Sequence, residues 1–198
     1  MDKNIDPKLA AELAQSPPAQ QVDLLFAYMV ENGQAYYDES VTQLQHALQA
    51  ANQARHAAAD PLQVTAALLH DLGHFLIDEH SKDADFRTED FFHEEAGAEY
   101  LQPFFSAAVT EAMKLHVPAK RYICSTDETY YNTLSEASKR SFALQGGFMS
   151  DEEKAEFEKN AYYKNAVQLR KWDDLAKEKE LEVPGLENYR EDVLGGLK

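Results

Sequence analysis

The chain has 198 residues, 44% of them hydrophobic and 11% aromatic, which is enough to bury the core of a single domain. Its formal net charge of −16 argues against nucleic-acid and anionic-membrane partners, because a polyanion is repelled wherever no basic patch offsets the charge. The single cysteine, Cys124, excludes an internal disulfide, and the N-terminus carries no apolar signal segment, so we expect a cytoplasmic protein.

Apolar residues recur at spacings of three and four along most of the chain, which predicts an all-α fold. We expect helices over 18–32, 41–58, 61–77, 90–101, 104–116, 130–144, 151–160, 162–178 and 185–195. Capping boxes at 40–43, with Ser40 as N-cap, and at 150–153 mark the starts of two of them. Asp60 before Pro61 marks a third start, because proline is tolerated at the first helical position.

The segment LLHDLGHFL, residues 68–76, places two histidines and an aspartate in an otherwise apolar helix. Burying such groups costs free energy unless they are hydrogen-bonded or bind a metal. His70 and His74 are four residues apart and share a helical face, while the adjacent Asp71 can reach the same cation or bridge two cations. Taken by itself, the segment fits a metal site and a pair of ordinary core histidines about equally well.

Other histidines and a second carboxylate fall on neighbouring predicted helices. His46 lies on the preceding helix, His93 opens the following one, His116 closes the next, and Asp173 lies in LRKWD. Helical hairpins bring such positions together, and imidazole with carboxylate suits iron, manganese or zinc better than calcium. These residues favour the metal interpretation of residues 68–76.

Lys120 follows the candidate ligand His116 by four residues. This position would allow it to hold an anionic group such as phosphate or phosphonate beside the metal, but taken by itself the residue is more often an ordinary solvated lysine. His56 and His80 have polar neighbours and are expected at the surface.

The ligand pattern and several longer segments resemble a known family. The order His46, His70-Asp71, Asp173 is similar to that of the HD-domain superfamily of helical metal-dependent proteins, and His93 and His116 make it similar to the di-metal branch. The segments are YYDESVTQLQHALQ (36–49), AALLHDLGH (66–74), HEEAGAEYL (93–101), HVPAKRYI (116–123), LSEASKRSFALQGGFM (134–149), LRKWD (169–173) and VPGLENYR (183–190). Together they resemble the HD-domain di-iron oxygenases that cleave the carbon–phosphorus bond of 1-hydroxyalkylphosphonates.

The resemblance implies an HD-domain helical bundle over residues 21–198 with a di-metal centre in its core, and it leaves residues 1–20 as an N-terminal extension. It implies two iron ions, Fe2+ and Fe3+, with Asp71 as the bridge between them. The implied iron ligands are His46, His70, Asp71, His93, His116 and Asp173.

The resemblance also implies residues that act on the substrate. His74 and Lys120 fall on catalytic positions that contact the phosphonate, and Ser135 or Ser138 adds a hydroxyl there. Tyr36 and Glu39 fall on the pair that covers the open iron position until substrate binds, which makes Tyr36 a further, displaceable metal ligand and both residues part of the substrate site.

The implied reaction converts a 1-hydroxy-2-aminoethylphosphonate and O2 into phosphate and a carboxylic acid. The carboxylic acid is glycine for a primary amine and glycine betaine for its trimethylammonium analogue. A primary ammonium group would pair with Glu39 and a trimethylammonium group with aromatic faces, and the sequence does not decide between them. Pro118 and Phe148 depart from the family pattern, and Phe148 puts the amine end of the substrate pocket in doubt.

Two other functions fit the residues less well. An HD-type phosphohydrolase would use the same ligands to activate water against a small phosphorylated metabolite, but it has no evident use for Tyr36. A metal-free helical sensor or interaction module would leave the apolar-helix histidines unexplained. The sequence indicates no oligomeric state.

Overall fold

The computed structural model describes residues 5–36, 41–77 and 92–198, and its regular structure is helical. The only extended pairings among these residues are two isolated bridges, Tyr36 with Thr42 and Phe105 with Leu197, so the predicted all-α class is confirmed. The helices are α1 Pro7–Gln15, α2 Pro18–Asn32, α3 Gln43–His56, α4 Pro61–Leu69, α5 Leu72–Ile77, α6 His93–Leu101, α7 Ala107–Lys114, α8 His116–Thr126, α9 Tyr130–Thr133, α10 Glu136–Leu144, α11 Asp151–Lys159, α12 Tyr163–Leu175, the 3-10 helix η1 Leu186–Tyr189 and α13 Arg190–Gly196.

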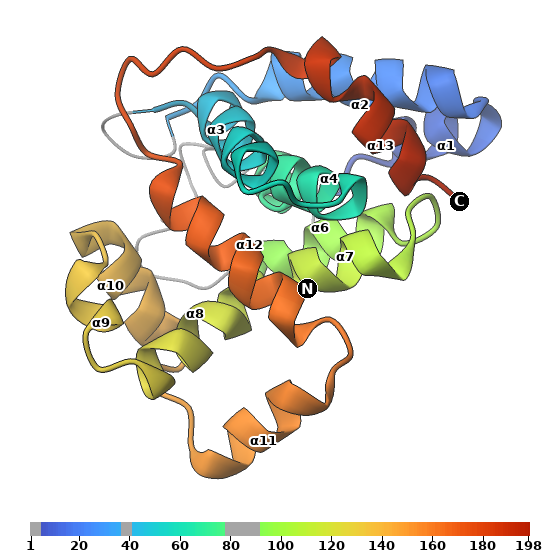
Figure 1. Cartoon of the computed structure of the whole chain (residues 1–198). Helices are drawn as coiled ribbons and strands as arrows, with labels where there is room; N and C mark the ends of the chain where they lie inside the picture. Colours follow the sequence, from blue (N-terminus) through green and yellow to red (C-terminus); the bar gives the residue numbers. More distant parts are fainter. Residues whose placement is uncertain (1–4, 37–40, 78–91) are drawn as a thin grey trace.

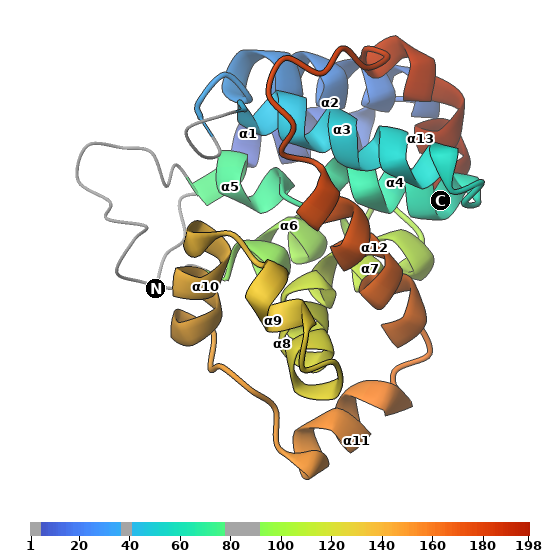
Figure 2. The ribbon, with the colours of Figure 1, turned by 60° about the vertical axis from the view of Figure 1, so that its left-hand side comes forward.

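Helices α3 and α4 form an antiparallel pair at the centre of the molecule (Figure 1). Helices α1, α2 and α13 cover one side of this pair, and α6 and α7 lie on the other side. Helix α12 crosses the bundle and contacts α3, α4, α7 and α8, while α11 lies at the far end of the molecule (Figure 2). The central position of α12 brings the C-terminal part of the chain against the helices that carry the histidines.

Helix α1 extends the core into the segment expected to be an N-terminal extension. Leu9 and Leu13 are buried in the same cluster as the apolar residues of α2, α4 and α7. The hydroxyl of Tyr100 on α6 donates to the backbone carbonyl of Asp6, which also caps α1 through its side chain. Residues 7–15 therefore pack on the domain, although no sequence pattern predicted a helix there.

Several predicted helices are divided in the structure. The segment 61–77 forms α4 and α5, because the chain turns at His70 and Asp71. The segment 130–144 forms α9 and α10, because Ser135 caps a new helix by accepting a hydrogen bond from the backbone amide of Ser138. The segment 185–195 begins as the 3-10 helix η1 before α13.

The expected helices 104–116 and 130–144 leave the residues between them as a loop, and this expectation is wrong. Residues HVPAK open α8, with Pro118 in its first turn, where the missing N–H of proline removes no helical hydrogen bond. The predicted capping box at 40–43 is also wrong. The capping box of α3 lies two residues later in the chain, with Thr42 as the N-cap and Gln45 as its partner. The caps at Asp60 and Ser150 are confirmed.

Within the described residues, no helix combines the length and apolar character needed to cross a bilayer. The expected cytoplasmic location stays a prediction.

The contact between α5 and α6 depends on two glycines. A Cβ added to Gly73 would lie 1.9 Å from the carbonyl oxygen of His93, and one added to Gly97 would lie 2.9 Å from the backbone nitrogen of Gly73. Only glycine permits these two backbones to approach so closely. The approach places the first residue of α6, His93, directly beside the turn that carries His70 and Asp71.

We predict that Gly73→Ala destabilises the metal-free protein by about 1–3 kcal/mol or more, because the new methyl group meets a backbone carbonyl that has no room to move away. Gly195→Ala is the matched control, since nothing lies within 4 Å of its added Cβ and alanine favours the helix α13. Urea unfolding of both variants measures the difference. Equal midpoints for the two variants would contradict the close contact.

Candidate metal centre

Six candidate ligand side chains from five regions of the chain converge inside the bundle. His46 lies near the start of α3, His93 and His116 are the first residues of α6 and α8, and Asp173 lies near the end of α12. His70 and Asp71 form the turn between α4 and α5. All six are buried, the most accessible being His93 at 8% exposure, so the ligand set implied by the family resemblance is brought together.

The carboxylate of Asp71 lies between two groups of imidazoles. Its Oδ2 is 3.3 Å from Nε2 of His46 and 3.3 Å from Nε2 of His70. His46 Nε2 is also 3.3 Å from Oδ1 of Asp173, and these three ligand residues, His46, His70 and Asp173, lie close enough to share one ion. This group forms the first half of the site.

The other oxygen of Asp71 faces the second group. Its Oδ1 is 3.4 Å from Nε2 of His93, 3.5 Å from Nε2 of His116 and 3.9 Å from Nε2 of His74. The rings of His74 and His93 stack with centroids 3.8 Å apart. Because each Asp71 oxygen serves a different group, the geometry fits a carboxylate that bridges two metal ions.

Backbone carbonyls orient three of the imidazoles. His46 Nδ1 lies 2.8 Å from the carbonyl oxygen of Ala176, His70 Nδ1 lies 2.9 Å from that of Ala67, and His116 Nδ1 lies 2.7 Å from that of Met113. A carbonyl accepts only from a protonated ring nitrogen, so each of these rings carries a proton on Nδ1 and turns its Nε2 toward the centre of the site. These are the outer contacts that metal-bound histidines commonly make.

The inner atoms of this set suit a cation better than they suit one another. Nε2 of His46 and Nε2 of His70 are 3.2 Å apart, and Oδ1 of Asp173 is buried without a hydrogen-bond donor among the described residues. Lone pairs and a carboxylate oxygen held this close repel one another unless a positive charge lies between them. The donor set of imidazole and carboxylate is that of a first-row transition metal.

The charges of the site shift the pKa values of its members. Burial alone would lower the pKa of His46, but the carboxylates of Asp173 and Asp71 raise it to about 9. Burial lowers the pKa of His116 well below its ordinary value. Burial opposes ionisation of Asp71 and Asp173, yet neighbouring positive groups hold both carboxyl pKa values well below the usual range. The two carboxylates therefore remain ionised and attract a cation.

A set of cations and hydroxyls lies next to the ligands. Lys120, one turn after His116 on α8, is 2% exposed and donates from Nζ to Oγ of Ser141 at 2.8 Å. Burial and then the nearby Arg170 guanidinium lower the Lys120 pKa to about 7. Lys177 donates to Oγ of Ser138 at 3.3 Å. The expectation that Lys120 is more than an exposed surface lysine is thus supported by its burial beside the ligands.

Sequence reasoning missed three members of this region: Ser141, Arg170 and Lys177. The serines at 135, 138 and 141 recur at helical spacing, which was a signal for a shared face of α10. Arg170 precedes Asp173 by three residues, a spacing that also places two side chains on one helical face. Lys177 follows the end of α12 and gave no comparable signal.

The remaining candidates occupy different surroundings. Ser135 acts as the N-cap of α10 and also donates to Oγ of Ser138 at 3.1 Å. Tyr36 is 67% exposed in the bridge to Thr42, so this structure does not bring it among the ligands. Glu39 lies outside the described residues.

The aromatic departure from the family pattern is Phe148. Its ring packs on those of Phe142 and Tyr131, at centroid distances of 5.0 and 5.6 Å, and it remains 58% exposed. The proposal that it shapes the amine end of the pocket stays a prediction. Pro118, the other departure, is part of the first turn of α8.

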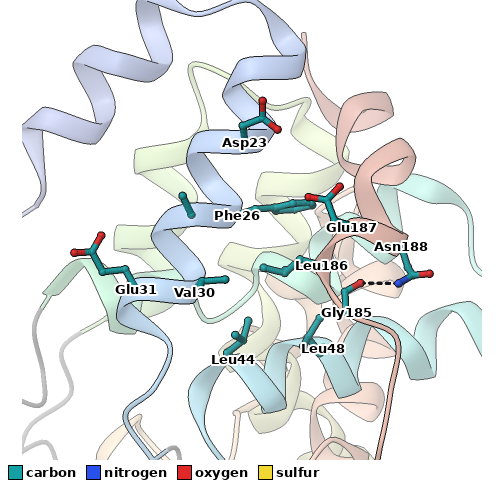
Figure 3. A pocket seen from close by; sticks show the side chains of 11 residues that line it. Asp23, Phe26, Val30, Glu31, Leu44, Leu48, Gly185, Leu186, Glu187 and Asn188 are labelled. Atoms are coloured by element: carbon teal, nitrogen blue, oxygen red, sulfur yellow. Dashed lines mark hydrogen bonds between the residues drawn. The ribbon is translucent and has the colours of Figure 1, made fainter.

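A surface hollow of about 700 Å³ lies apart from the candidate centre (Figure 3). It is lined mainly by apolar side chains of α2, α3 and the segment 185–188, including Leu44 and Leu48. These two leucines flank His46 by two residues on each side and so lie on the opposite face of α3. The hollow carries none of the candidate ligands.

The chain is similar to one domain family and to several known proteins. Residues 44–145 match the model of the HD domain. A hydroxymethylphosphonate dioxygenase of Gimesia maris is 54% identical over 194 residues, covering 98% of this chain and 96% of the relative. A [1-hydroxy-2-(trimethylamino)ethyl]phosphonate dioxygenase (glycine-betaine-forming) of Leisingera caerulea is 45% identical over 75% of this chain and 76% of the relative. An uncharacterized protein of Acanthamoeba polyphaga mimivirus is 33% identical over 80% of this chain and 73% of the relative.

We predict that Asp71→Ala removes metal from both halves of the site, because each carboxylate oxygen faces a different group of imidazoles. His56→Ala is the control, since His56 is exposed at the end of α3 and should leave the metal content unchanged. Elemental analysis of the two purified proteins gives the comparison. Retention of metal in Asp71→Ala, or its loss in His56→Ala, would show that the ligand set is wrong.

Proposed function

The chain belongs to the HD-domain family of phosphonate dioxygenases, O2-dependent enzymes that cleave the carbon–phosphorus bond, and we propose that its substrate is a small 1-hydroxyalkylphosphonate, with hydroxymethylphosphonate as the first candidate. The observation that carries the choice is the 54% identity with the Gimesia maris hydroxymethylphosphonate dioxygenase across 98% of this chain. The trimethylamino-substituted substrate is the second candidate, supported by the Leisingera caerulea relative over 75% of the chain.

The proposed reaction is an oxidation by O2 without another co-reactant. Written as neutral acids, hydroxymethylphosphonic acid and O2 give formic acid and phosphoric acid, so both oxygen atoms appear in the products. The carbon–phosphorus bond breaks, the carbon is oxidised to a carboxylic acid and O2 is reduced. The phosphohydrolase alternative requires water in place of O2, and the named relatives do not favour it.

We propose that the metal centre holds two iron ions, as Fe2+ and Fe3+, because a reaction with O2 needs a redox metal and the donor set suits iron. Iron supplies the electron transfer to O2 that no side chain here provides. Three ligand residues, His46, His70 and Asp173, would hold one ion, while His93 and His116 would hold the other. Asp71 would join the two halves with one oxygen toward each.

The cations beside the ligands would hold the phosphonate. Lys120, Lys177 and the hydroxyls of Ser138 and Ser141 form a connected group along one side of the centre. A phosphonate entering this group would favour the protonated form of Lys120 and so gain a charge-assisted hydrogen bond. This arrangement would orient the substrate with its hydroxyl-bearing carbon toward the metals.

His74 would take part in the same site from the other side. Its Nε2 faces Asp71 at 3.9 Å, and its side chain is 18% exposed, the largest exposure among the histidines of the site. A partly exposed imidazole between the metal ligands and the solvent is placed to contact a substrate as it binds. The same role was implied for His74 by the family resemblance.

Tyr36 would act as a removable cover. Its backbone is paired with Thr42, the N-cap of the helix that carries His46, while its side chain is exposed. An anchored backbone with an exposed side chain is compatible with a swing toward the metals before substrate binds. Covering the centre at that stage would limit unproductive reduction of O2.

We predict that iron-loaded protein consumes O2 and releases phosphate from hydroxymethylphosphonate with a kcat/KM at least about tenfold above that for either aminated substrate, equivalent to about 1.4 kcal/mol of discrimination. Zinc-loaded protein is the control and should release no phosphate. Phosphate assay and an oxygen electrode give both quantities. Phosphate release from a small phosphate ester by the zinc form, without O2, would instead indicate a hydrolase.

We predict that oxidised, iron-loaded protein shows a visible charge-transfer band from a Tyr36 phenolate and that the band fades when hydroxymethylphosphonate is added. Tyr36→Phe should lack the band and consume O2 without substrate. Tyr37→Phe is the control and should keep the band. A band lost only in Tyr37→Phe would shift the assignment by one residue, and a band unchanged in both variants would exclude the cover.

A further inference from the structure

A buried guanidinium lies directly behind the ligand Asp173. Arg170, 3% exposed on α12, donates from Nη1 to Oδ2 of Asp173 at 2.6 Å. The other terminal nitrogen of the same guanidinium pairs with Oδ1 of Asp174. Asp173 and Asp174 are consecutive on a helix and point in different directions, so Arg170 uses both arms of its fork to reach them.

Tyr130, from the short helix α9, completes this group. Its hydroxyl is hydrogen-bonded to Oδ2 of Asp174 and accepts a hydrogen bond of 3.3 Å from Nε of Arg170. Burial, and then the charge of Asp174, raise the pKa of the Tyr130 hydroxyl, so it remains protonated and able to donate. Three sides of the Arg170 guanidinium are therefore occupied, by Asp173, Asp174 and Tyr130.

The contacts divide the two oxygens of Asp173 between different tasks. Oδ2 receives the Arg170 hydrogen bond, whereas Oδ1 is buried, lacks a hydrogen-bond donor among the described residues and lies 3.3 Å from Nε2 of His46. Only Oδ1 is thus available to an ion between Asp173 and the histidines. An arginine side chain released from its other partners has several rotatable bonds and no longer fixes this division.

We propose that Tyr130 and Asp174 are positioning residues that hold Arg170 against one oxygen of Asp173, so that Asp173 presents a single oxygen to its metal ion. The inference rests on the proposed metal centre and not on the choice of substrate. It assigns to Tyr130 and Asp174 a role in metal binding, although neither side chain lies among the ligands. Outer partners of this kind commonly change metal affinity by about 10–100-fold when removed.

The competing explanation is structural, because Tyr130 also links α9 to α12. A purely structural link predicts a lower free energy of unfolding with an unchanged metal site. A positioning role predicts the reverse pattern, namely a changed metal site in a protein that remains folded. The two explanations therefore differ in measurements that do not require turnover.

The test uses the full chain loaded with Fe2+ or with Co2+. Tyr130→Phe removes the hydroxyl and keeps the ring, and Asp174→Asn removes the charge and keeps the shape. We expect each variant to bind the ion of the His46, His70 and Asp173 group about 10–100-fold less tightly in chelator competition. We also expect the Co2+ d–d absorption of each variant to change in intensity, because the number of oxygens bound to the ion changes.

Tyr131→Phe is the matched control, because Tyr131 is the neighbouring tyrosine and packs on Phe142 and Phe148. It should match the unmodified chain in metal affinity and Co2+ spectrum. Arg170→Lys is a further variant that keeps the positive charge and loses the fork, so it should reproduce the loss seen with Asp174→Asn. Urea unfolding of the metal-free proteins shows which variants remain folded.

Unchanged metal affinity and an unchanged Co2+ spectrum in both Tyr130→Phe and Asp174→Asn would overturn the inference, whatever the effect on unfolding. If Tyr130→Phe fails to fold, Asp174→Asn and Arg170→Lys decide the outcome by the same two measurements. The proposed function fails separately. A chain that releases no phosphate from any 1-hydroxyalkylphosphonate, yet shows these metal-binding changes, would retain the positioning role and lose the proposed substrate class.

Discussion

The structure depends on one buried carboxylate, that of Asp71, held between imidazoles from four different parts of the chain. Each of its oxygens faces two histidines of the ligand set at 3.3–3.5 Å, and almost no water reaches the group. A carboxylate and several inward-facing ring nitrogens are stable together in such a place only with positive charge between them. A metal ion in this place would therefore couple metal binding to helix packing. One half of the centre joins α3 and α12 to Asp71, and the other half joins α6 and α8 to it.

The local conformation of the chain follows from this constraint. A continuous helix over 61–77 would point His70 and Asp71 about one hundred degrees apart around the helix axis. The helix instead breaks at these two residues, between α4 and α5, and both side chains face the centre of the site. Gly73 and Gly97 then allow α6 to approach closely enough for His93 to face the carboxylate. Within the five residues HDLGH, His70 and Asp71 are candidate ligands and form the turn between two helices, and Gly73 makes the close backbone contact with α6.

Much of this architecture could be predicted from the sequence, and the failures have physical causes. Helix 18–32 matches α2 because its apolar period is regular and Pro18 fits the first helical position. Helix α8 lies between the expected helices 104–116 and 130–144 and was missed, because proline usually interrupts a helix, whereas Pro118 lies in the first turn of α8. Lys177 was missed because its contact joins it to Ser138 on α10, and a single sequence carries no signal for a pairing so far apart, whereas the spacing of Arg170 and Asp173 on one helical face was a signal that was not used.

The distribution of charge over the chain means that a site for an anionic substrate needs local, buried positive charge. The chain has a net charge of −16, so its surface repels an approaching doubly charged phosphonate. Dissolved salt weakens this repulsion but does not reverse it. Lys120 is buried beside the candidate ligands, where positive charge is screened less than at the surface, whereas the neighbouring Arg170 is already paired with Asp173 and Asp174. Burial, and then the nearby Arg170 guanidinium, lower the pKa of Lys120 and so disfavour its protonated form in the free protein, and an anion bound beside it would favour that form. With the proposed role of Lys120, selectivity for an anionic substrate would arise from desolvated charge within the site and not from attraction by the protein surface.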